Sequence, residues 1–170
     1  GPNGRDLISS FADYVLENDL GGEHYSDPDL TCREHPGRVE DYEFDRLREM
    51  MIDVINQPEA LKQWFGRFVT TPRHELDIAP AEPPYKPDEV VWALMDGGVL
   101  TRLSGLRVLE VGGSYFINSE RLDTVDPKAA DALCRYTVLG KKELGAALKN
   151  PAFVAELTGL VNQGYWFFDE

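Results

Sequence analysis

The feature that most constrains this chain is a run of bulky apolar side chains at helical spacing in residues 58–70. Pro58 suits the first position of a helix, and the apolar residues after it fall on one face. They are Leu61, Trp64, Phe65, Phe68 and Val69. Two large aromatic rings within one turn are too apolar to remain in water, so this face must be buried against another part of the protein or another molecule.

Two further amphipathic helices are predicted N-terminal to this face. One covers residues 5–19 and is stopped by Gly21-Gly22, and the other covers residues 42–56, where apolar residues repeat every three or four positions. Residues 23–41 show no period and predict a long loop. A three-helix unit of about 70 residues has little core of its own, which favours burial against a second copy or a domain outside this sequence.

Five prolines between residues 72 and 87 exclude a regular helix or a central strand there, and predict an extended connector. We therefore predict a helical domain over residues 1–71, a proline-rich linker over 72–87 and a second domain over 88–170.

The second half alternates helical and strand patterns. A helix is predicted over residues 88–96, followed by strands over 99–103, 106–111 and 114–118 that two-residue turns join into a small antiparallel meander. Helices are predicted over 127–138, 141–149 and 151–162, and an aromatic strand over 165–168. The predicted fold class is mainly α with a small antiparallel β-meander, an order that suits a winged-helix-like domain.

Charge and composition reduce the number of function classes that fit this chain. Thirty acidic residues against seventeen basic ones leave a net charge of −13, which repels polyphosphates and disfavours nucleic acid as a partner. The longest apolar run, residues 90–95, is far shorter than the roughly 20 residues of a membrane span. Two cysteines, Cys32 and Cys134, make no disulfide framework, and no signal peptide is visible, so a cytoplasmic protein is predicted. The first residue is not Met, so we expect a fragment of a longer protein.

No catalytic pattern is present in the sequence. The three histidines, His24, His35 and His74, lie in predicted loops and form neither H-x-D nor H-E-x-x-H. Cys134 lies in a predicted helix as a small apolar residue. We predict no catalytic, cofactor-binding or metal-binding residue. Two alternatives stay open: a stand-alone winged-helix nucleic-acid-binding module, and a small metalloenzyme that uses the three histidines.

Several stretches of the sequence resemble bacterial ribosomal oxygenases, the JmjC-type cupin hydroxylases that modify an arginine of a large-subunit ribosomal protein. In the first half they are F-A-D-Y-V-L (11–16), Y-S-D-P-D (25–29), L-R-E-M-M (47–51), I-N-Q-P-E (55–59) and K-Q-W-F-G (62–66). Further along they are R-H-E-L-D-I-A-P (73–80), E-P-P-Y (82–85), G-L-R-V-L (105–109) and G-Y-W-F-F (164–168). The resemblance covers essentially the whole chain.

The resemblance implies the C-terminal region of such an enzyme, without its catalytic half. In the family an upstream cupin domain binds Fe(II) through an H-x-D and a distal histidine, and also binds 2-oxoglutarate. This chain has no H-x-D, so no catalytic residue is carried over. The present chain therefore corresponds to a helical dimerisation domain followed by a winged-helix-like domain. The resemblance implies that this region is non-catalytic by itself.

The resemblance also implies the partners: a second copy, the missing catalytic domain, and through it the ribosomal-protein substrate. The candidate interface residues are Phe44, Leu47, Met51, Trp64, Phe65 and Phe68. For each of them the sequence leaves intramolecular core and cross-subunit contact equally open, because an obligate interface resembles a domain core cut in half. The acidic loop with Asp27 and Asp29 is hypothesised to attract the basic substrate.

Overall fold

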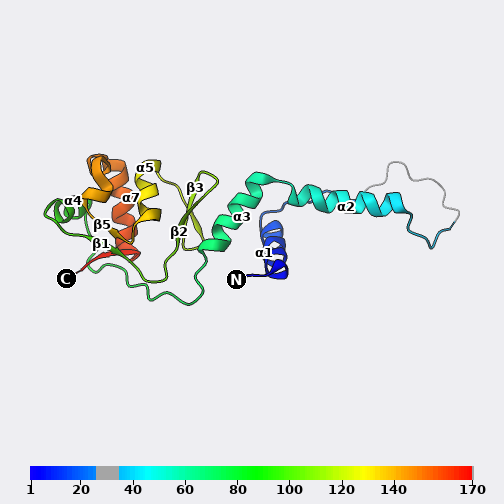
Figure 1. Ribbon diagram of the computed structural model, residues 1–170, viewed down its shortest axis with the longest axis horizontal. Coiled ribbons are helices and arrows are strands. Elements are labelled where there is room, and N and C mark those ends of the chain that lie inside the picture. The colour runs from blue at the N-terminus through cyan, green and yellow to red at the C-terminus, as the bar shows by residue number, and fades with distance from the viewer. Residues whose placement is uncertain (26–34, 170) are drawn as a thin grey trace. The chain divides into compact units, whose positions relative to one another are not determined.

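The structure is a computed structural model that describes residues 1–25 and 35–169 (Figure 1). Residues 1–64 and 65–170 form two compact units. This division falls N-terminal to the predicted linker, within a helix. Within the described residues, none of the helices combines the length and apolarity needed to cross a membrane.

The first unit consists of helices whose limits lie close to the predicted ones. They are α1 (Gly4–Glu17), α2 (Asp41–Ile55) and the first part of α3 (Pro58–Thr70). At the start of α1 the Asn3 side chain accepts hydrogen bonds from the backbone N–H groups of Arg5 and Asp6, and Asp6 accepts one from the Asn3 N–H at 2.9 Å. This reciprocal cap satisfies backbone donors that the helix leaves open, and so fixes where α1 begins.

The interior of the first unit is very small. Among its described residues, Phe11 and Trp64 are the only buried hydrophobic side chains. Their rings meet edge to face, with centroids 5.3 Å apart, and the Trp64 Nε1–H donates a hydrogen bond to Ser10 Oγ at 3.0 Å. The turn after α1 also approaches α2 closely, since a Cβ on Gly21 would lie 2.7 Å from Cγ2 of Val54. These few contacts leave most of the apolar surface of the unit uncovered.

The second unit begins with the last part of α3. Along the chain it contains α4 (Pro87–Met95), β1 (Leu100–Arg102), β2 (Val108–Val111), β3 (Ser114–Ile117), β4 (Glu120–Leu122), α5 (Pro127–Arg135), β5 (Val138–Leu139), α6 (Lys141–Leu144), a 3₁₀ turn η1 (Gly145–Lys149), α7 (Pro151–Asn162) and β6 (Trp166–Phe168). Prolines open α4, α5 and α7, and the Asp126 and Asn150 side chains cap α5 and α7. The predicted helix 151–162 has the limits of α7.

The strands do not form the single meander that the sequence predicts. They make two antiparallel sheets, with the orders β5-β1-β6 and β2-β3-β4. The backbone of β1 is already paired on both sides: the Arg102 N–H donates to Thr137 O at 2.8 Å, and the Leu103 N–H donates to Tyr165 O at 2.9 Å. The predicted pairing of residues 99–103 with 106–111 is therefore wrong. The helix predicted over 127–138 ends at Arg135, because Val138 and Leu139 belong to β5.

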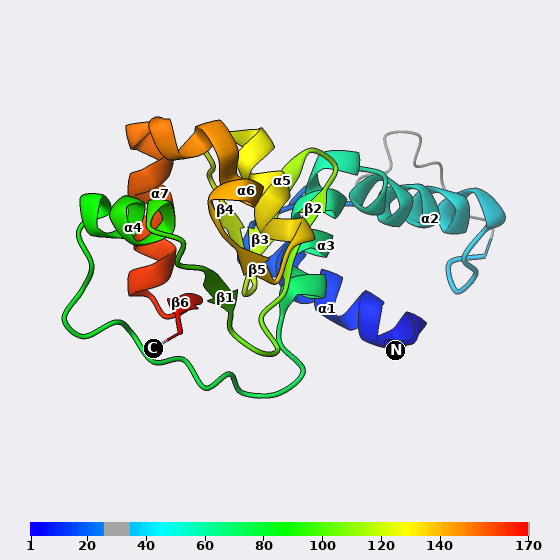
Figure 2. The same cartoon turned by 60° about the vertical axis from the view of Figure 1, so that its left-hand side comes forward.

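The main hydrophobic core lies between the helices and sheets of the second unit, where α7 lies beside α4 (Figure 2). Leu100 on the central strand β1 and Trp166 on β6 are fully buried in it. Other fully buried members come from three helices and β5. They are Val90, Leu94, Leu133, Leu139, Phe153 and Leu157.

The proline-rich segment is held against this core. The side chain of Asn162, at the end of α7, accepts a hydrogen bond from the Tyr85 N–H at 2.7 Å and donates one to the Tyr85 carbonyl at 3.0 Å. The Asn162 carbonyl accepts a third bond, from the Ala81 N–H. Gly164 has φ +87°, and a Cβ there would lie 2.4 Å from the Ala79 carbonyl oxygen. Residues 79–85 thus form neither a helix nor a strand, and they are fixed to the second unit.

Candidate functional site

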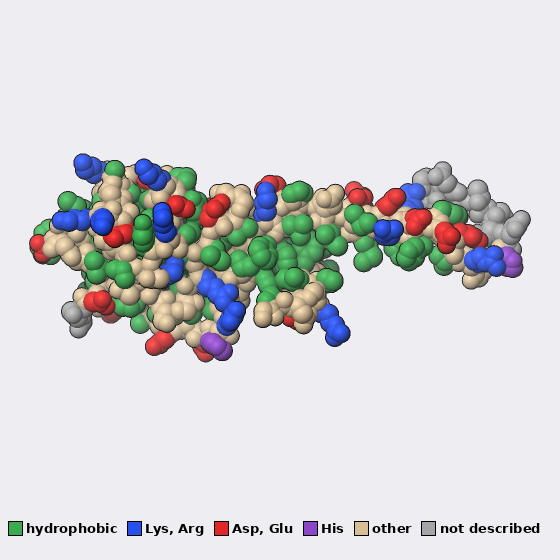
Figure 3. Space-filling view, viewed as in Figure 1, with side chains coloured by type: hydrophobic (Ala, Val, Ile, Leu, Met, Phe, Trp, Pro, Cys, Tyr) green, Lys and Arg blue, Asp and Glu red, His purple; other side chains and the backbone are tan. Residues whose placement is uncertain are grey.

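Helix α2 carries an exposed apolar stripe. Phe44, Leu47, Met51 and Ile55 follow one another at spacings of three and four residues, so they share one face of the helix. Their side chains are 60%, 49%, 63% and 50% exposed, respectively. Figure 3 shows hydrophobic side chains gathered along one side of this helix. We call these four residues the α2 stripe.

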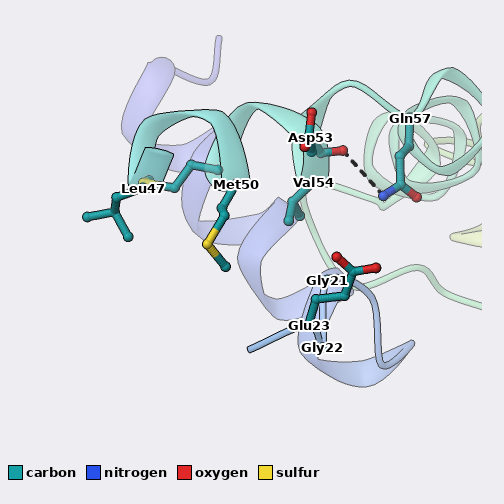
Figure 4. A pocket seen from close by; sticks show the side chains of 9 residues that line it. Gly21, Gly22, Glu23, Leu47, Met50, Asp53, Val54 and Gln57 are labelled. Carbon is teal, nitrogen blue, oxygen red and sulfur yellow. Dashed lines mark hydrogen bonds between the residues drawn. The ribbon is translucent and has the colours of Figure 1, made fainter. Parts of the chain in front are cut away.

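A groove adjoins the stripe within the first unit. It has a volume of about 620 Å³ and lies between the turn after α1 and the side of α2 (Figure 4). Leu47 and Met51 line it as well as belonging to the stripe, so the groove and the stripe form one continuous surface. At one end of it the Gln57 Nε2–H donates a hydrogen bond to the Asp53 carbonyl at 3.3 Å. The remaining lining residues are Gly21, Gly22, Glu23, Met50 and Val54.

Helix α1 adds to the uncovered apolar area, because Ile8 and Leu16 are both largely exposed. Isolated exposed apolar residues are ordinary, but a continuous row on one face marks an interaction surface. Burying such area is worth roughly 25 cal/mol per Å². The first unit therefore presents an apolar surface whose burial would stabilise it.

The six candidate interface residues separate into different environments. Phe44, Leu47 and Met51 lie together on the α2 stripe, while Trp64 is buried against Phe11 within its own unit. On the part of α3 that belongs to the second unit, Phe65 is exposed and Phe68 is half-buried. Ile55 and Ile8 were not among the candidates, although the periodicity of α2 places Ile55 on the same face as Met51.

The described residues offer no arrangement for metal chemistry. Across residues 1–25 and 35–169, no three His, Cys, Asp or Glu side chains come close enough to hold a metal ion. His24, His35 and His74 are exposed and far apart in the sequence. Cys32, Asp27 and Asp29 lie outside the described residues. The described side chains therefore do not fit the Fe(II) that the resemblance implies for the parent enzyme.

Cys134 on α5 is half-buried, and its environment opposes ionisation. Burial raises the pKa of the Cys134 thiol to about 11, with a further upward contribution from the negative charge of Asp131. Arg102 acts in the opposite direction but does not offset these two effects. Because the thiolate is the nucleophile, this cysteine has the properties of a packing residue and not of a catalytic one.

We expect Cys134 to alkylate slowly. In a Cys32→Ser variant, reaction with iodoacetamide at pH 8 should be about a hundredfold slower than in the same chain unfolded in urea, because a pKa near 11 leaves only about one thiol in a thousand ionised. The rate, followed by mass spectrometry, should rise about tenfold per pH unit up to pH 10. A rate that levels off near pH 9 in the folded chain would contradict the raised pKa.

Comparison with known proteins identifies the family. The sequence pattern of the ROXA-like winged helix matches residues 53–167, which is more than half of the chain. The chain belongs to the ROXA-like winged-helix family. This match confirms that the chain contains a winged-helix domain, and it begins within α2, N-terminal to the predicted start at residue 88.

The resemblance to ribosomal oxygenases is also confirmed. The chain is 55% identical over 168 residues to the C-terminal part of the ribosomal protein uL16 3-hydroxylase of Escherichia coli, covering 99% of this chain and 45% of that protein. Among solved structures, it is similar to the ribosomal oxygenase YcfD of Escherichia coli, with a TM-score of 0.91 and 55% identity over 99% of this chain. It is similar as well to YcfD in complex with cobalt and 2-oxoglutarate, with a TM-score of 0.89. This ROXA-like chain spans about half the length of these relatives.

Proposed function

We propose that this ROXA-like chain is the non-catalytic dimerisation and winged-helix region of a ribosomal oxygenase. In this proposal residues 1–71 associate with a second copy, residues 88–170 form the winged-helix domain, and residues 72–87 join them. The parent would be a cytoplasmic JmjC-type enzyme that uses Fe(II) and 2-oxoglutarate to hydroxylate an arginine of a large-subunit ribosomal protein. Its catalytic cupin domain lies outside this sequence, so we assign no catalytic step to these residues.

The similarity to the uL16 3-hydroxylase and to YcfD supports the oxygenase part of the proposal. Those relatives are about twice as long as this chain, and YcfD has been captured with cobalt and 2-oxoglutarate. The described residues here do not fit a metal. We therefore propose that the other half of the parent enzyme binds the metal and the cosubstrate.

The exposed α2 stripe is the observation that carries the dimerisation part. A helix with four large apolar residues about half exposed is unfavourable as a water-facing surface, and a twofold axis would let the same surface of two copies cover each other. The stripe and its groove share Leu47 and Met51, so a partner helix could pack on the stripe while its side chains enter the groove. The net charge of −13 disfavours the alternative, a nucleic-acid ligand, because the phosphate backbone is also negative.

The test is the solution mass by light scattering behind a sizing column over a tenfold dilution. A mass near twice 19.1 kDa, about 38 kDa, that survives dilution supports the proposal. Because each copy carries −13, raising the salt concentration should tighten the association by screening repulsion. A monomer at all concentrations and salt levels would refute self-association through this region.

A further inference from the structure

Helix α4 in the second unit exposes the largest aromatic side chain available to a partner. Of the three tryptophans, Trp64 and Trp166 are buried, whereas Trp92 is 70% exposed. Met95, one turn later on the same helix, is more than half exposed. Exposed tryptophan is uncommon on a protein surface, and tryptophan is enriched among the residues that dominate binding energy at interfaces.

Three hollows that share lining residues form one groove along α4, and Trp92 lines two of them. The first, of about 460 Å³, lies between residues 79–86 and β6, and shares Tyr85 and Glu89 with the second. The second, of about 470 Å³, shares Asp88 and Trp92 with the third, of about 510 Å³, which continues to the start of α7. We call the three together the Trp92 groove. The first and third hollows share no lining residue, so the three follow one another in a row, which suits an elongated peptide segment.

The middle hollow, which Trp92 lines, is acidic. Among the described residues, those lining the middle hollow are Tyr85, Asp88, Glu89, Trp92 and Ala93, which include two carboxylates and no basic side chain. The outer hollows have one lysine each, Lys86 and Lys149. Asp88 Oδ1 accepts a hydrogen bond from the Glu89 N–H at 3.1 Å, and Glu89 Oε1 accepts one from the Lys86 N–H at 3.2 Å, so both carboxylates are held in position at the start of α4.

The third hollow has apolar walls. Val91, Met95 and Val154 line it beside Trp92. An indole face next to fixed carboxylates is the combination that binds a guanidinium group, by cation–π contact and by ion pairing at once. The apolar walls would accept a neighbouring apolar side chain of the same segment.

We propose that the Trp92 groove binds an extended basic segment of a partner protein. An arginine of that segment stacks on the Trp92 indole and pairs with Asp88 and Glu89, and an apolar residue next to it enters the hollow between α4 and α7. The charge complementarity selects this occupant over a second copy of the chain, since two copies that each carry −13 would bring like charges together at an acidic groove. The proposal is independent of self-association, because it uses no residue of the α2 stripe.

The test titrates the whole 170-residue chain by calorimetry with two synthetic eight-residue peptides. One alternates arginine and valine, and the other alternates glutamate and valine. We expect only the arginine peptide to bind, with an affinity that falls as salt is raised. Trp92→Ala should weaken this binding about tenfold, and Asp88→Asn about threefold.

A matched variant separates local recognition from overall charge. Asp123 lies on the loop after β4, outside the three hollows, and its side chain is 89% exposed. Asp123→Asn removes the same charge as Asp88→Asn, and we expect it to leave binding of the arginine peptide unchanged. Circular dichroism should show that all three variants keep the fold, because each replaces a side chain at the surface.

Several results would overturn the proposal. Equal binding of the glutamate peptide, equal losses in Asp88→Asn and Asp123→Asn, or full binding by Trp92→Ala would each show that the groove does not recognise a basic segment. A loss of self-association in Trp92→Ala would assign the groove to a second copy. Protection of Trp92 from acrylamide quenching in a longer chain that includes the catalytic half would show that this half covers it.

Discussion

Replacing Phe44 and Met51 together by aspartate should convert the proposed dimer into monomers. Both side chains belong to the α2 stripe and are about 60% exposed in the isolated chain, so the substitutions leave the small core of the first unit untouched. In a twofold dimer each substitution occurs twice, and four carboxylates would then have to be buried without partners. Hot-spot apolar residues contribute about 2 kcal/mol or more each, so the dissociation constant should rise at least a thousandfold.

The matched control for this variant is Lys62→Glu. It changes the net charge by the same two units, from −13 to −15, but at an exposed position on α3. There Lys62 Nζ forms a surface ion pair with Glu59 Oε1 at 3.6 Å. Light scattering should give about 19 kDa for the double variant and about 38 kDa for the control at the same protein concentration. A double variant that keeps its helical circular dichroism and still has the dimer mass would place the interface away from α2.

Gly66→Ala should destabilise the second unit strongly. Gly66 lies on α3, and a Cβ there would lie 2.2 to 2.5 Å from three ring carbons of Phe116, a fully buried residue of β3. The helix cannot shift away easily, because Thr70 Oγ1 donates to the Gly66 carbonyl at 2.7 Å and accepts from the Ser119 N–H at 3.0 Å. The Val69 carbonyl also accepts a hydrogen bond from Arg107. We expect a loss of about 3 kcal/mol, which lowers the Tm of a unit of this size by about 12 to 24 °C.

Gly159→Ala provides the control for the glycine-to-alanine change itself. Gly159 lies on α7 at an exposed position, and a Cβ there would meet no atom within 4 Å. Alanine in a helix interior is favoured over glycine by about 1 kcal/mol, so this variant should unfold at a slightly higher temperature than the parent chain. Thermal melts that give the same Tm for both variants would contradict the close packing of α3 on β3.

The helices could be predicted closely because their signals are local. Pro58, Pro127 and Pro151 mark first turns, and apolar residues three and four apart mark the inward faces. The strands were predicted less well. β4 and β5 are only three and two residues long, too short for an alternating pattern, and they exist because β3 and β1 offer them backbone partners.

The residues of the candidate interaction surface also could not be predicted fully from local sequence patterns. Phe44 and Trp64 both lie on apolar helical faces, and nothing in the spacing separates them. The structure places Trp64 against Phe11 and leaves Phe44 exposed. Trp92 likewise follows Val90 and Val91 in an apolar run, where the sequence gives no sign that it faces outward.

The sequence by itself determined the family, the starts of the helices that a proline opens, the acidic charge and the absence of an H-x-D, since each of these can be read from neighbouring residues or from composition. The tertiary structure alone decided which apolar faces are covered, how β1 is paired, and that residues 79–85 are fixed to α7. The physical reason is that burial and strand pairing depend on segments far apart in the chain, such as Tyr85 and Asn162. Their meeting depends on how the whole unit packs, which local periodicity does not encode.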